Sequence, residues 1–503
     1  MLEKKELYSY QKKDIEKIFD KIEVSAYNYH LLYQLPTGGG KTVIFSEIAR
    51  RYIEQYHKKV LVLTHRIELC KQTSRMLHTF GVHNKIINSA IKELPDQNEY
   101  SCFVAMIETL KNRLNDEKVA IDNIGLVIID EAHYNSFRKL FYAFKNSFIL
   151  GVTATPLSSN IKLPMYQNYN ELIVGDTIQN LIDKGYLAKA TTYSYNVGLS
   201  SLKIGINGDY TVKSSDELYS NLYMQEKLLQ AYAIHSLQKK TLIFNNGIQT
   251  SLHVLDTFKN AGYNIRHLDN TTPADERKEI IQWFKKTPNA ILTSVGILTT
   301  GFDEPTVETI IINRATKSLT LYFQMIGRGS RKLPNKKEFS IIDLGNNALR
   351  FGLWNEPVNW QHIFSSPEYY LENLRSDTEI ENTFRYVMPD ELRIKFANSQ
   401  SIDFDVETAF KETLRTNKKA KTVLETSILQ HAQMCLDNTN DLLEAKKLSK
   451  ELLDDITYRV KIYCNCLGNV TKNYRTWLVE DYVNQLNATI SKLYRIKVME
   501  EAD

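Results

Sequence analysis

The segment LPTGGGKT, from Leu35 to Thr42, constrains the fold more than any other stretch of the chain. It follows the apolar run HLLYQL and precedes TVIFSEIARRYIEQY, in which apolar residues recur at helical spacing, so it lies where a strand turns into a helix. Glycines at such a turn let backbone amides close around phosphate oxygens, and the helix N-terminus adds its dipole. The segment therefore predicts a phosphate-binding loop, with Gly38, Gly39 and Gly40 as its cradle.

Two polar residues complete the predicted loop. Lys41 would bring a positive charge to the β- and γ-phosphates of a nucleotide, and the hydroxyl of Thr42 can hold Mg²⁺. The general pattern G-x-x-x-x-G-K-[ST] expects glycine where this chain has Leu35, so the match is incomplete at its first position. An ordinary glycine-rich turn is the alternative, and the flanking strand, helix and lysine argue against it.

Two adjacent acids follow the buried strand predicted from NIGLVIIDEAHYNSF. Asp130 and Glu131 emerge at its carboxyl end, where parallel sheets place their ligand groups. Asp130 can hold the Mg²⁺ that Thr42 also contacts, and Glu131 can orient and deprotonate the water that attacks the γ-phosphate. His133 would then respond to the reaction at the γ-phosphate. A salt-bridged pair of surface acids is the alternative, which the phosphate loop earlier in the chain disfavours.

Three further apolar runs end in polar residues. KKVLVLTHRIEL runs into Arg66, CFVAMIETL runs into Thr109, and SFILGVTATP runs into Thr153 and Thr155. Each has the form of a buried strand, so these side chains are predicted at the ligand-binding edge of a parallel sheet. The hydroxyls of Thr153 and Thr155 would link a nucleotide site to a moving partner. For the first two runs, a strand end followed by a solvated turn is an equally good interpretation.

A second α/β run begins at KKTLIF and repeats strand and helix without another phosphate loop. Its segment LTLYFQMIGRGSRK predicts a short helix that carries Gln324, Arg328 and Arg331, with both arginines on one face. Such guanidinium groups can stabilise the charge of phosphoryl transfer when two domains close. A basic surface and a phosphate clamp for nucleic acid are the alternatives.

A weaker signal precedes the phosphate loop. The stretch ELYSYQKKDIEKIFDKI has the pattern of a helix and contains Gln11. A glutamine amide offers a donor and an acceptor together, which suits the N6/N7 edge of adenine, and the ring of Tyr8 or Tyr10 could stack on the base.

Length and composition bound the class of protein. The 503 residues are enough for about three domains. No apolar run approaches the roughly 20 residues of a membrane span, and MLEKKELYSYQKK has no apolar segment after its charges, so we expect a soluble, cytoplasmic protein without a membrane contact. Five scattered cysteines fit reduced thiols. The net charge of +4 is too small to prove a nucleic-acid partner.

The order of these motifs resembles that of the superfamily 2 DEAD/DEAH-box helicases. YQ, PTGGGKT, THRIEL, DEAH, TATP, TLIF, GFDEP and QMIGRGSR stand in the family's order between residues 8 and 331, and PTGxGKT is the helicase form of the phosphate loop. GFDEP, INRATKS and QMIGRGSR look most like the branch of the RadD-type bacterial repair helicases and the helicase subunits of restriction enzymes. The chain departs from that branch in reading LYSYQ instead of LRPYQ, and in having no zinc-binding cysteine cluster after the second domain.

The resemblance implies two RecA-like domains that close on ATP and Mg²⁺ while nucleic acid is bound. It implies catalytic roles for Lys41, Glu131, Gln324, Arg328 and Arg331. The nucleotide would be held by Gln11, Thr37, Gly38, Gly39, Gly40, Lys41, Thr42 and Asp303, and the metal by Thr42 and Asp130. Arg66, Thr109, Asn245 and Thr293 would lie along the nucleic-acid backbone, and His133, Thr153 and Thr155 would couple the two sites.

We therefore expect an α/β protein of two tandem RecA-like domains, residues 1–190 and 191–365, followed by an all-helical C-terminal domain, residues 366–503. The resemblance fades after about Phe364, where the helical region begins. That region contains the basic run RTNKKAK, which is more often a solvated loop than a contact. It also contains an apolar stripe of the kind that usually forms a core, made of Tyr474, Leu478, Tyr482, Leu486 and Ile490.

The expected function is that of an ATP-dependent helicase or translocase that hydrolyses ATP to move on or unwind nucleic acid, DNA before RNA, in repair, restriction or phage-related processes. One alternative is a motor subunit that moves on duplex without unwinding it. Another is an ATP-gated nucleic-acid clamp without hydrolysis, against which Glu131, Arg328 and Arg331 argue. A protein partner would bind through the helical region.

Overall fold

The computed structural model describes residues 6–25, 28–88, 98–115, 121–160, 162–299, 301–384, 386, 388–416, 418–468 and 470–500. The chain divides into two compact units, each built from separate stretches of sequence. The first unit comprises Met1–Tyr195, Ile204–Tyr210 and His235–Ser376, and the second comprises Asn196–Lys203, Thr211–Ile234 and Asp377–Asp503.

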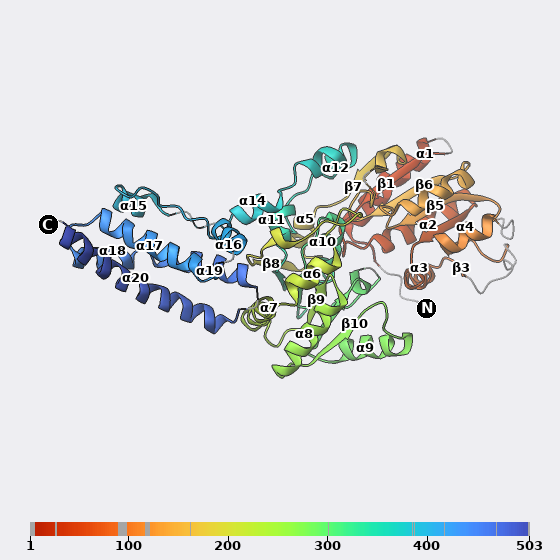
Figure 1. Cartoon of the computed structure of the whole chain (residues 1–503). Helices are drawn as coiled ribbons and strands as arrows, with labels where there is room; N and C mark the ends of the chain where they lie inside the picture. Colours follow the sequence, from red (N-terminus) through yellow and green to blue (C-terminus); the bar gives the residue numbers. More distant parts are fainter. Residues whose placement is uncertain are drawn as a thin grey trace. The chain divides into compact units, whose positions relative to one another are not determined.

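The first unit holds two parallel sheets (Figure 1). The strands of the first sheet are β1 (His30–Gln34), β2 (Lys59–Thr64), β3 (Asn84–Ile87), β4 (Cys102–Met106), β5 (Ile124–Asp130), β6 (Phe148–Thr153) and β7 (Glu171–Val174). They lie in the order β3-β4-β2-β5-β6-β1-β7, and all neighbouring pairs are parallel. The central strands are buried along almost their whole length, which explains their continuous apolar sequences.

Helices connect these strands and cover the sheet. The amphipathic pattern of residues 9–24 forms the first of them, with Ile15, Ile18 and Phe19 on its buried side. The helices of this part are α1 (Ser9–Val24), α2 (Lys41–Tyr56), α3 (Ile67–Thr79), α4 (Ile107–Asn115) and α5 (Ile178–Asp183), with the 3₁₀ segments η1 (Asn135–Phe144) and η2 (Met165–Gln167).

The second sheet repeats the parallel arrangement. Its strands are β8 (Lys189–Ser194), β9 (Thr241–Asn245), β10 (Ile265–Leu268), β11 (Ile291–Val295), β12 (Thr309–Asn313) and β13 (Glu338–Asp343). They lie in the order β10-β11-β9-β12-β13-β8, again with every pair parallel. The first strand of this sheet begins at Lys189, close to the start expected at residue 191.

The first unit continues to Ser376, so its last helix, α13 (Pro367–Glu372), lies beyond the expected end of the motor at residue 365. The helix before it, α12 (Trp360–Ser365), contacts the first sheet, because Gln361 donates a hydrogen bond from Nε2 to the carbonyl of Leu172 on β7, at 2.7 Å. The helices around the second sheet are α8 (Ile248–Asn260), α9 (Ala274–Lys286), α10 (Leu319–Ile326), α11 (Asn347–Phe351), α12 (Trp360–Ser365) and α13 (Pro367–Glu372), with the 3₁₀ segment η4 (Ile297–Thr299).

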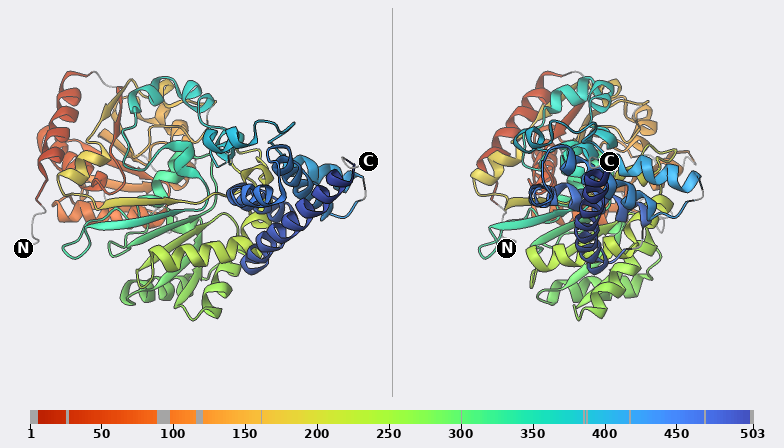
Figure 2. Two further views of the ribbon diagram at one scale, coloured as in Figure 1. Left: turned by 90° about the vertical axis from the view of Figure 1, so that its left-hand side faces the viewer. Right: turned by 60° about the vertical axis from the view of Figure 1, so that its left-hand side comes forward.

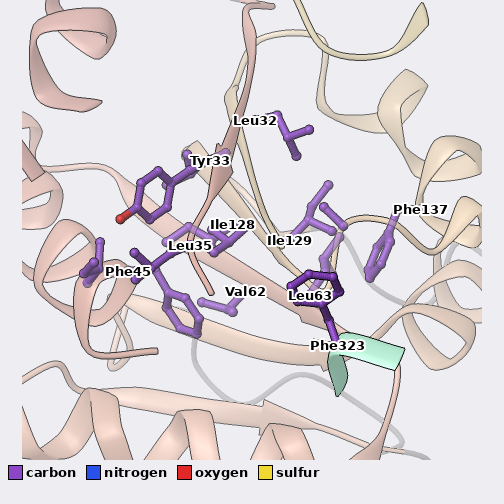
Figure 3. Close-up of a cluster of buried hydrophobic side chains, with 14 of the residues drawn as sticks. Leu32, Tyr33, Leu35, Phe45, Val62, Leu63, Ile128, Ile129, Phe137 and Phe323 are labelled. Carbon is purple, nitrogen blue, oxygen red and sulfur yellow. The ribbon is translucent and has the colours of Figure 1, made fainter. Parts of the chain in front are cut away.

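The hydrophobic core of the first unit includes side chains from both sheets. Figure 3 shows the part of it around the first sheet, together with Phe323. Leu32 on β1, Val62 on β2 and Ile128 on β5 are fully buried at its centre. Phe323, which α10 contributes from beside the second sheet, is 4% exposed and belongs to the same cluster. Burial of this ring fixes α10, and therefore the residues that follow it, against the first sheet.

The second unit is helical (Figures 1 and 2). The prediction of an all-helical C-terminal region is confirmed, but segments from between β8 and β9 join it. Ser200, for example, donates its backbone N–H to Oε1 of Glu381 at 2.7 Å. The elements of this unit are η3 (Leu199–Ser201), α6 (Val212–Tyr219), α7 (Leu222–His235), α14 (Asp377–Asn382), α15 (Asp390–Arg393), η5 (Ile394–Phe396), α16 (Val406–Arg415), α17 (Thr422–Asp437), α18 (Leu442–Lys450), α19 (Leu453–Leu467) and α20 (Lys472–Glu500).

The apolar stripe on α20 forms the core of this unit, where α20 runs beside α17 and α19 (Figures 1 and 2). Leu478, Tyr482, Leu486 and Ile490 are at most 5% exposed, which confirms their prediction as core residues. The prediction was wrong for Tyr474, which is 43% exposed because it lies in the first turn of α20, where its ring pairs with that of exposed Trp477.

Among the residues that the structure describes, every helix is too short or too polar to cross a bilayer. The predicted basic run from Arg415 to Lys421 lies partly outside the described residues. Its described lysines, Lys418, Lys419 and Lys421, are exposed.

A buried polar network crosses the core of the second unit. His431 lies 2.8 Å from Asp455 through Nε2 and 2.9 Å from the hydroxyl of Tyr482 through Nδ1. Arg459, which is 2% exposed, places Nη2 2.8 Å from the same aspartate oxygen and donates from Nη1 to Oγ of Ser427 at 3.0 Å. Because a buried charge without partners is costly, these contacts tie α17, α19 and α20 into one register.

We expect the second unit to lose stability as the pH falls from about 6.5 to about 4. Burial lowers the pKa of His431 to about 4, although the hydrogen bond to Asp455 opposes this change. An unfolded histidine has a pKa of about 6.5, so the unfolded state alone binds the extra proton in this range. The free energy of unfolding should therefore fall by on the order of 3 kcal/mol.

The variant His431→Gln provides the control, because its amide can still donate to Asp455 and accept from Tyr482. This variant should be less stable at neutral pH, but its free energy of unfolding should change much less between about pH 6.5 and about pH 4. Asp455, whose pKa is lowered from 3.8, titrates below this range. The measurement is urea unfolding followed by circular dichroism, and an equal loss of stability in both proteins would assign the effect to another group.

Candidate nucleotide-binding site

Three loops meet at the carboxyl edge of the first sheet. β6 lies between β1 and β5, and the register pairs Gln34 of β1 with Thr153 of β6, and Asp130 of β5 with Val152 of β6. Because neighbouring parallel strands end at the same edge, the phosphate loop, the acids after β5 and the threonines after β6 converge. Sequence reasoning placed each of them at a strand end, and the strand order brings them together.

The phosphate loop has the backbone shape that its glycines permit. Gly38 and Gly40 have φ angles of 92° and 85°, in the left-handed region that favours glycine, and α2 starts at the next residue, Lys41. The ammonium of Lys41 has one weak contact, with the carbonyl of Leu35 at 3.5 Å. Burial lowers the pKa of Lys41, although the nearby carboxylates of Glu131 and Asp130 oppose this effect.

The N-terminal tyrosines and Gln11 lie against the same loop. Tyr10 donates its hydroxyl hydrogen to the carbonyl of Gly39 at 2.6 Å, and Gln11 Nε2 lies 3.4 Å from that carbonyl. Tyr10 is buried, whereas Tyr8 is 51% exposed and its ring centroid lies 4.4 Å from that of Tyr186. Of the two rings proposed for stacking, Tyr8 is therefore the accessible one, and sequence reasoning missed its partner Tyr186.

The paired acids occupy a strained turn after β5. Glu131 has a φ of 53°, which is unusual for a residue with a side chain, and its backbone N–H donates to Oδ1 of Asp130 at 3.0 Å. Burial and the charge of Glu131 raise the pKa of Asp130. Burial also acts to raise the pKa of Glu131, but Lys41 and His133 outweigh it, and this pKa is lowered. Glu131 is therefore the carboxylate of the pair that stays ionised beside the predicted phosphates, as a base requires.

A row of polar contacts leads from Glu131 to α10, the helix that precedes the arginines. Oε2 of Glu131 lies 3.4 Å from Nδ1 of His133, which lies 3.0 Å from Oγ1 of Thr153. Thr153 donates from Oγ1 to the carbonyl of Thr155 at 3.1 Å, and Thr155 donates from Oγ1 to the hydroxyl of Thr320 on α10 at 2.9 Å. The three residues predicted to couple the sites thus form one path, whose end at Thr320 no sequence signal indicated.

The prediction that one helix carries both arginines is wrong. α10 ends at Ile326, and Arg328 and Arg331 lie in the turn that follows. Glycine has low helix propensity, and the sequence GRGS ends the helix here. We call residues 327–331 the arginine turn.

The two arginines make different contacts. Arg331 donates from Nη1 to the carbonyl of Gly38 at 2.8 Å and from Nε to Oδ1 of Asp303 at 3.1 Å. Arg328 donates from Nη1 to the carbonyl of Phe302 at 2.6 Å and from Nε to that of Thr299 at 3.1 Å. Burial lowers the pKa of Arg328 to about 10, against the attraction of Glu131. Arg331 therefore reaches the phosphate loop directly, and Arg328 faces the acids electrostatically.

A buried lysine supports the arginine turn, and sequence reasoning missed it. Lys336 is 5% exposed and donates from Nζ to the carbonyl of Gly329 at 2.7 Å and to that of Pro305 at 3.0 Å. Burial lowers its pKa to about 8. The ammonium thus ties the arginine turn to the GFDEP segment that carries Asp303.

Sequence reasoning also missed His65, which adjoins the acids. Its ring centroid lies 4.2 Å from that of Tyr134, and neither ring nitrogen has a hydrogen-bond partner among the described residues. Burial lowers the pKa of His65 to about 4, although the charge of Glu131 opposes this effect. The signal was available, because His65 ends the strand run that precedes Arg66.

The four residues predicted to contact nucleic acid fall into two classes. Arg66, which donates from Nη1 to the carbonyl of Ile297 at 3.3 Å, and Thr109, in the first turn of α4, are partly exposed. Asn245 and Thr293 are at most 1% exposed, and Asn245 donates from Nδ2 to Oγ1 of Thr293 at 2.8 Å. Because the side chains of Asn245 and Thr293 hydrogen-bond to each other in this structure, their contact with nucleic acid stays a prediction.

Buried polar atoms at the site match the groups of a nucleotide and its metal. Nε2 of Gln324 is buried without a hydrogen-bond partner among the described residues, and so is Oε2 of Glu131, whose 3.4 Å contact with Nδ1 of His133 is not a hydrogen bond. An unpaired acceptor, an unpaired donor and the weakly bound Lys41 ammonium suit an attacking water and phosphate oxygens. The hard oxygen donors of Thr42 and Asp130 suit Mg²⁺.

The close approach of the phosphate loop and the arginine turn depends on Gly327. A Cβ at this position would lie 2.5 Å from Cγ2 of Thr37, although the φ of −56° is ordinary for any residue. We expect Gly327→Ala to separate the two segments and to lower ATP turnover by about 10- to 100-fold, because overpacking costs about 1–3 kcal/mol.

The matched control is Gly198→Ala, where a Cβ would meet no atom within 4 Å and φ is −71°. Its steady-state turnover should equal that of the parent protein. Turnover by Gly327→Ala at the parent rate would show that the approach of the two segments is not needed.

Comparisons with known proteins agree with this geometry. The family model described as "Type III restriction enzyme, res subunit" matches residues 4–158, and the model "Helicase conserved C-terminal domain" matches residues 224–332. The Saccharomyces cerevisiae protein named as the ATP-dependent helicase IRC3 is 33% identical over 332 residues, which are 61% of this chain and 47% of that protein. The 51.5 kDa protein of Lactococcus phage (isolate 7-9) is 29% identical over 337 residues, which are 66% of this chain and 69% of that protein.

A solved structure has the same fold. The fragment of an HsdR subunit of a type I restriction enzyme from Vibrio vulnificus YJ016 superimposes with a TM-score of 0.56 at 21% identity, covering 69% of this chain and 66% of that one. The chain spans about half the length of its yeast relative. With two parallel α/β sheets, a phosphate loop facing an arginine turn and both family models matched in order, the chain belongs to the superfamily 2 helicases, in the group related to restriction-enzyme subunits.

Proposed function

We propose that this chain is an ATP-dependent motor that moves on nucleic acid and uses hydrolysis at the phosphate loop to change its grip. One observation carries the proposal: the row of contacts from Glu131 through His133, Thr153 and Thr155 to Thr320 links the candidate catalytic base to α10, the helix that precedes the arginine turn. A change in the ionisation or hydrogen bonding of Glu131 during hydrolysis would alter this row, and with it the contact between the sheets.

The proposed roles at the nucleotide follow from the contacts of each side chain. The backbone amides around Gly38, Gly39 and Gly40 and the ammonium of Lys41 would hold the phosphates, with Thr37 at the edge of the loop. Thr42 and Asp130 would hold Mg²⁺, which neutralises phosphate charge when it is bound. Gln11 lies against the carbonyl of Gly39 in the loop and would bind the edge of the adenine base.

The proposed chemistry needs a base and two cations. Glu131, kept ionised by Lys41 and His133, would accept the proton of the attacking water while Gln324 orients that water. Arg331 and Arg328 would stabilise the charge that spreads over the transferred phosphoryl group. Asp303 keeps the guanidinium of Arg331 aimed at the phosphate loop.

The proposed track is a nucleic-acid strand held mainly through its phosphates. Arg66 and Thr109 would touch it, and the buried pair Asn245 and Thr293 would support the strand ends behind it. DNA is proposed before RNA because GFDEP and QMIGRGSR look most like the repair and restriction branch of the family. We further propose that residues 1–190 and 191–365 act as the two moving domains, and that the helical region binds a protein partner.

A second candidate is a translocase that moves on duplex without separating its strands. The matched restriction-subunit model and the HsdR-like fold favour it. Displacement of a labelled strand from a partial duplex, compared with displacement of a third strand from a triplex, separates the two activities. The first experiment is the rate of ATP hydrolysis with single-stranded and duplex DNA and RNA, and a rate that none of them raises would contradict both candidates.

Two substitutions should separate binding from hydrolysis. Lys41→Ala removes the charge that meets the phosphates, so it should weaken nucleotide binding. Glu131→Gln keeps the shape but removes the base, so it should bind ATP, hydrolyse it at least about 100-fold more slowly and stay bound to nucleic acid. Fluorescent-nucleotide titration and single-turnover hydrolysis measure the two effects. If Glu131→Gln kept the parent rate, the assignment of the base would be wrong.

Arg331→Ala should lower the rate of hydrolysis by on the order of 10³ and change nucleotide affinity less, because the guanidinium acts most strongly on the charge of the transition state. The neighbouring exposed Lys332 offers the control, and Lys332→Ala should hydrolyse ATP at the parent rate. A variant Arg331→Ala that kept its hydrolysis and had only a weaker affinity for nucleic acid would favour a phosphate clamp for the strand.

A further inference from the structure

Two cationic side chains contact one phenol in the second unit, and a third acts on it electrostatically. Arg475, in the first turn of α20, places Nη1 3.4 Å from the hydroxyl of Tyr223 on α7. Lys227, one turn along α7, places Nζ 4.7 Å from the centroid of the Tyr223 ring. Lys461 on α19 also acts on Tyr223 electrostatically. Figure 1 shows α7 beside the start of α20.

None of the three cations has an acidic partner within the described part of the chain. Lys227 donates to the backbone carbonyl of Asn196. Arg475 has the phenol as its side-chain contact. All three are partly buried, as is Tyr223. Like charges held together away from bulk water repel one another, so the cluster has an uncompensated positive field.

The ionisation of the cluster reflects that field. Burial acts to raise the pKa of Tyr223, but Lys227, Arg475 and Lys461 together outweigh burial and lower it. Burial lowers the pKa of Lys461, and repulsion from Lys227 and Arg475 lowers it further against the attraction of Tyr223. The uncompensated positive charge contributes to both changes, and an anion bound at this place would stabilise the charged lysine.

We propose that Lys227, Lys461, Arg475 and Tyr223 form an anion site that binds a backbone phosphate of a nucleic-acid strand. The three cations supply the charge. The phenol accepts a hydrogen bond from Arg475 and keeps its own hydrogen to donate. The inference that the anion belongs to a nucleic acid rests on the proposed function, whereas the site itself lies in the other unit from the nucleotide residues.

Aromatic side chains near the cluster favour a nucleic-acid strand over an acidic protein. Tyr474 precedes Arg475 in the first turn of α20, and its ring centroid lies 5.6 Å from that of Trp477. The two side chains are 43% and 52% exposed. Exposed aromatic rings on the same turns of a helix as a cation are typical of surfaces that bind single strands, where bases stack while phosphates meet the charges.

The test is the salt dependence of strand binding without nucleotide. The probe is a labelled single-stranded DNA oligonucleotide of mixed sequence, titrated by fluorescence anisotropy from about 50 to about 300 mM salt. The double variant Lys461→Gln, Arg475→Gln should reduce the slope of log K against log salt by about 0.7, the value for the one phosphate that the protein no longer neutralises. The control Lys447→Gln, Lys450→Gln removes the same charge from α18 of the same unit and should leave the slope unchanged.

Each other outcome has a defined meaning once circular dichroism shows that both variants are folded. Equal slopes for the two double variants would overturn the site. If the parent protein bound no nucleic acid at all, that result would contradict the proposed function, and with it the assignment of the anion to a nucleic acid. Binding of polyglutamate as tight as that of DNA, abolished by the same substitutions, would assign the surface to an acidic protein partner instead. Displacement of DNA by millimolar inorganic phosphate at constant ionic strength would show a site for free phosphate.

Discussion

The close approach of the phosphate loop and the arginine turn across the candidate site is the constraint on which the rest of the first unit depends. A Cβ on Gly38 would lie 2.7 Å from Oγ of Ser330, and a Cβ on Gly327 would lie 2.5 Å from Cγ2 of Thr37. Because glycine has no side chain, the phosphate loop and the arginine turn touch, and the Arg331 guanidinium reaches the carbonyl of Gly38. Phe323, buried in the shared core just before the arginine turn, holds that approach in place.

This approach sets the electrostatics of the site. Lys41 and Arg328 face Asp130 and Glu131 in a buried environment, where charges act strongly on one another. Burial acts to raise the pKa of both acids, and the neighbouring cations, Lys41 first, outweigh it at Glu131. The second sheet thus contributes charge to the first, which gives a physical reason why the chemistry should depend on the contact between the sheets.

In the part of the chain that the structure describes, the second unit pairs its charges in its core but not around Tyr223. Its core is held by the apolar face of α20 and by the network of His431, Asp455 and Arg459, in which every cation has an acidic or hydrogen-bonding partner. Around Tyr223 the same unit leaves three cations without an acid among the described residues. A surface that leaves charges uncompensated while its core pairs them is suited to binding an anionic partner.

The sequence by itself determined the parallel α/β class, the phosphate loop and the paired acids, because each depends on local patterning. An apolar strand followed by glycines and a lysine, or by Asp130 and Glu131, is typical of a nucleotide site at the carboxyl edge of a parallel sheet. It also determined the stripe from Leu478 to Ile490, since helical periodicity is local. Tertiary structure alone decided that the arginines lie beyond α10, that Thr320 and Lys336 belong to the site, and that Asn245 and Thr293 face each other. These features depend on strand order and on contacts between residues far apart in sequence, such as Thr155 and Thr320 with a sequence separation of 165, which no local pattern records.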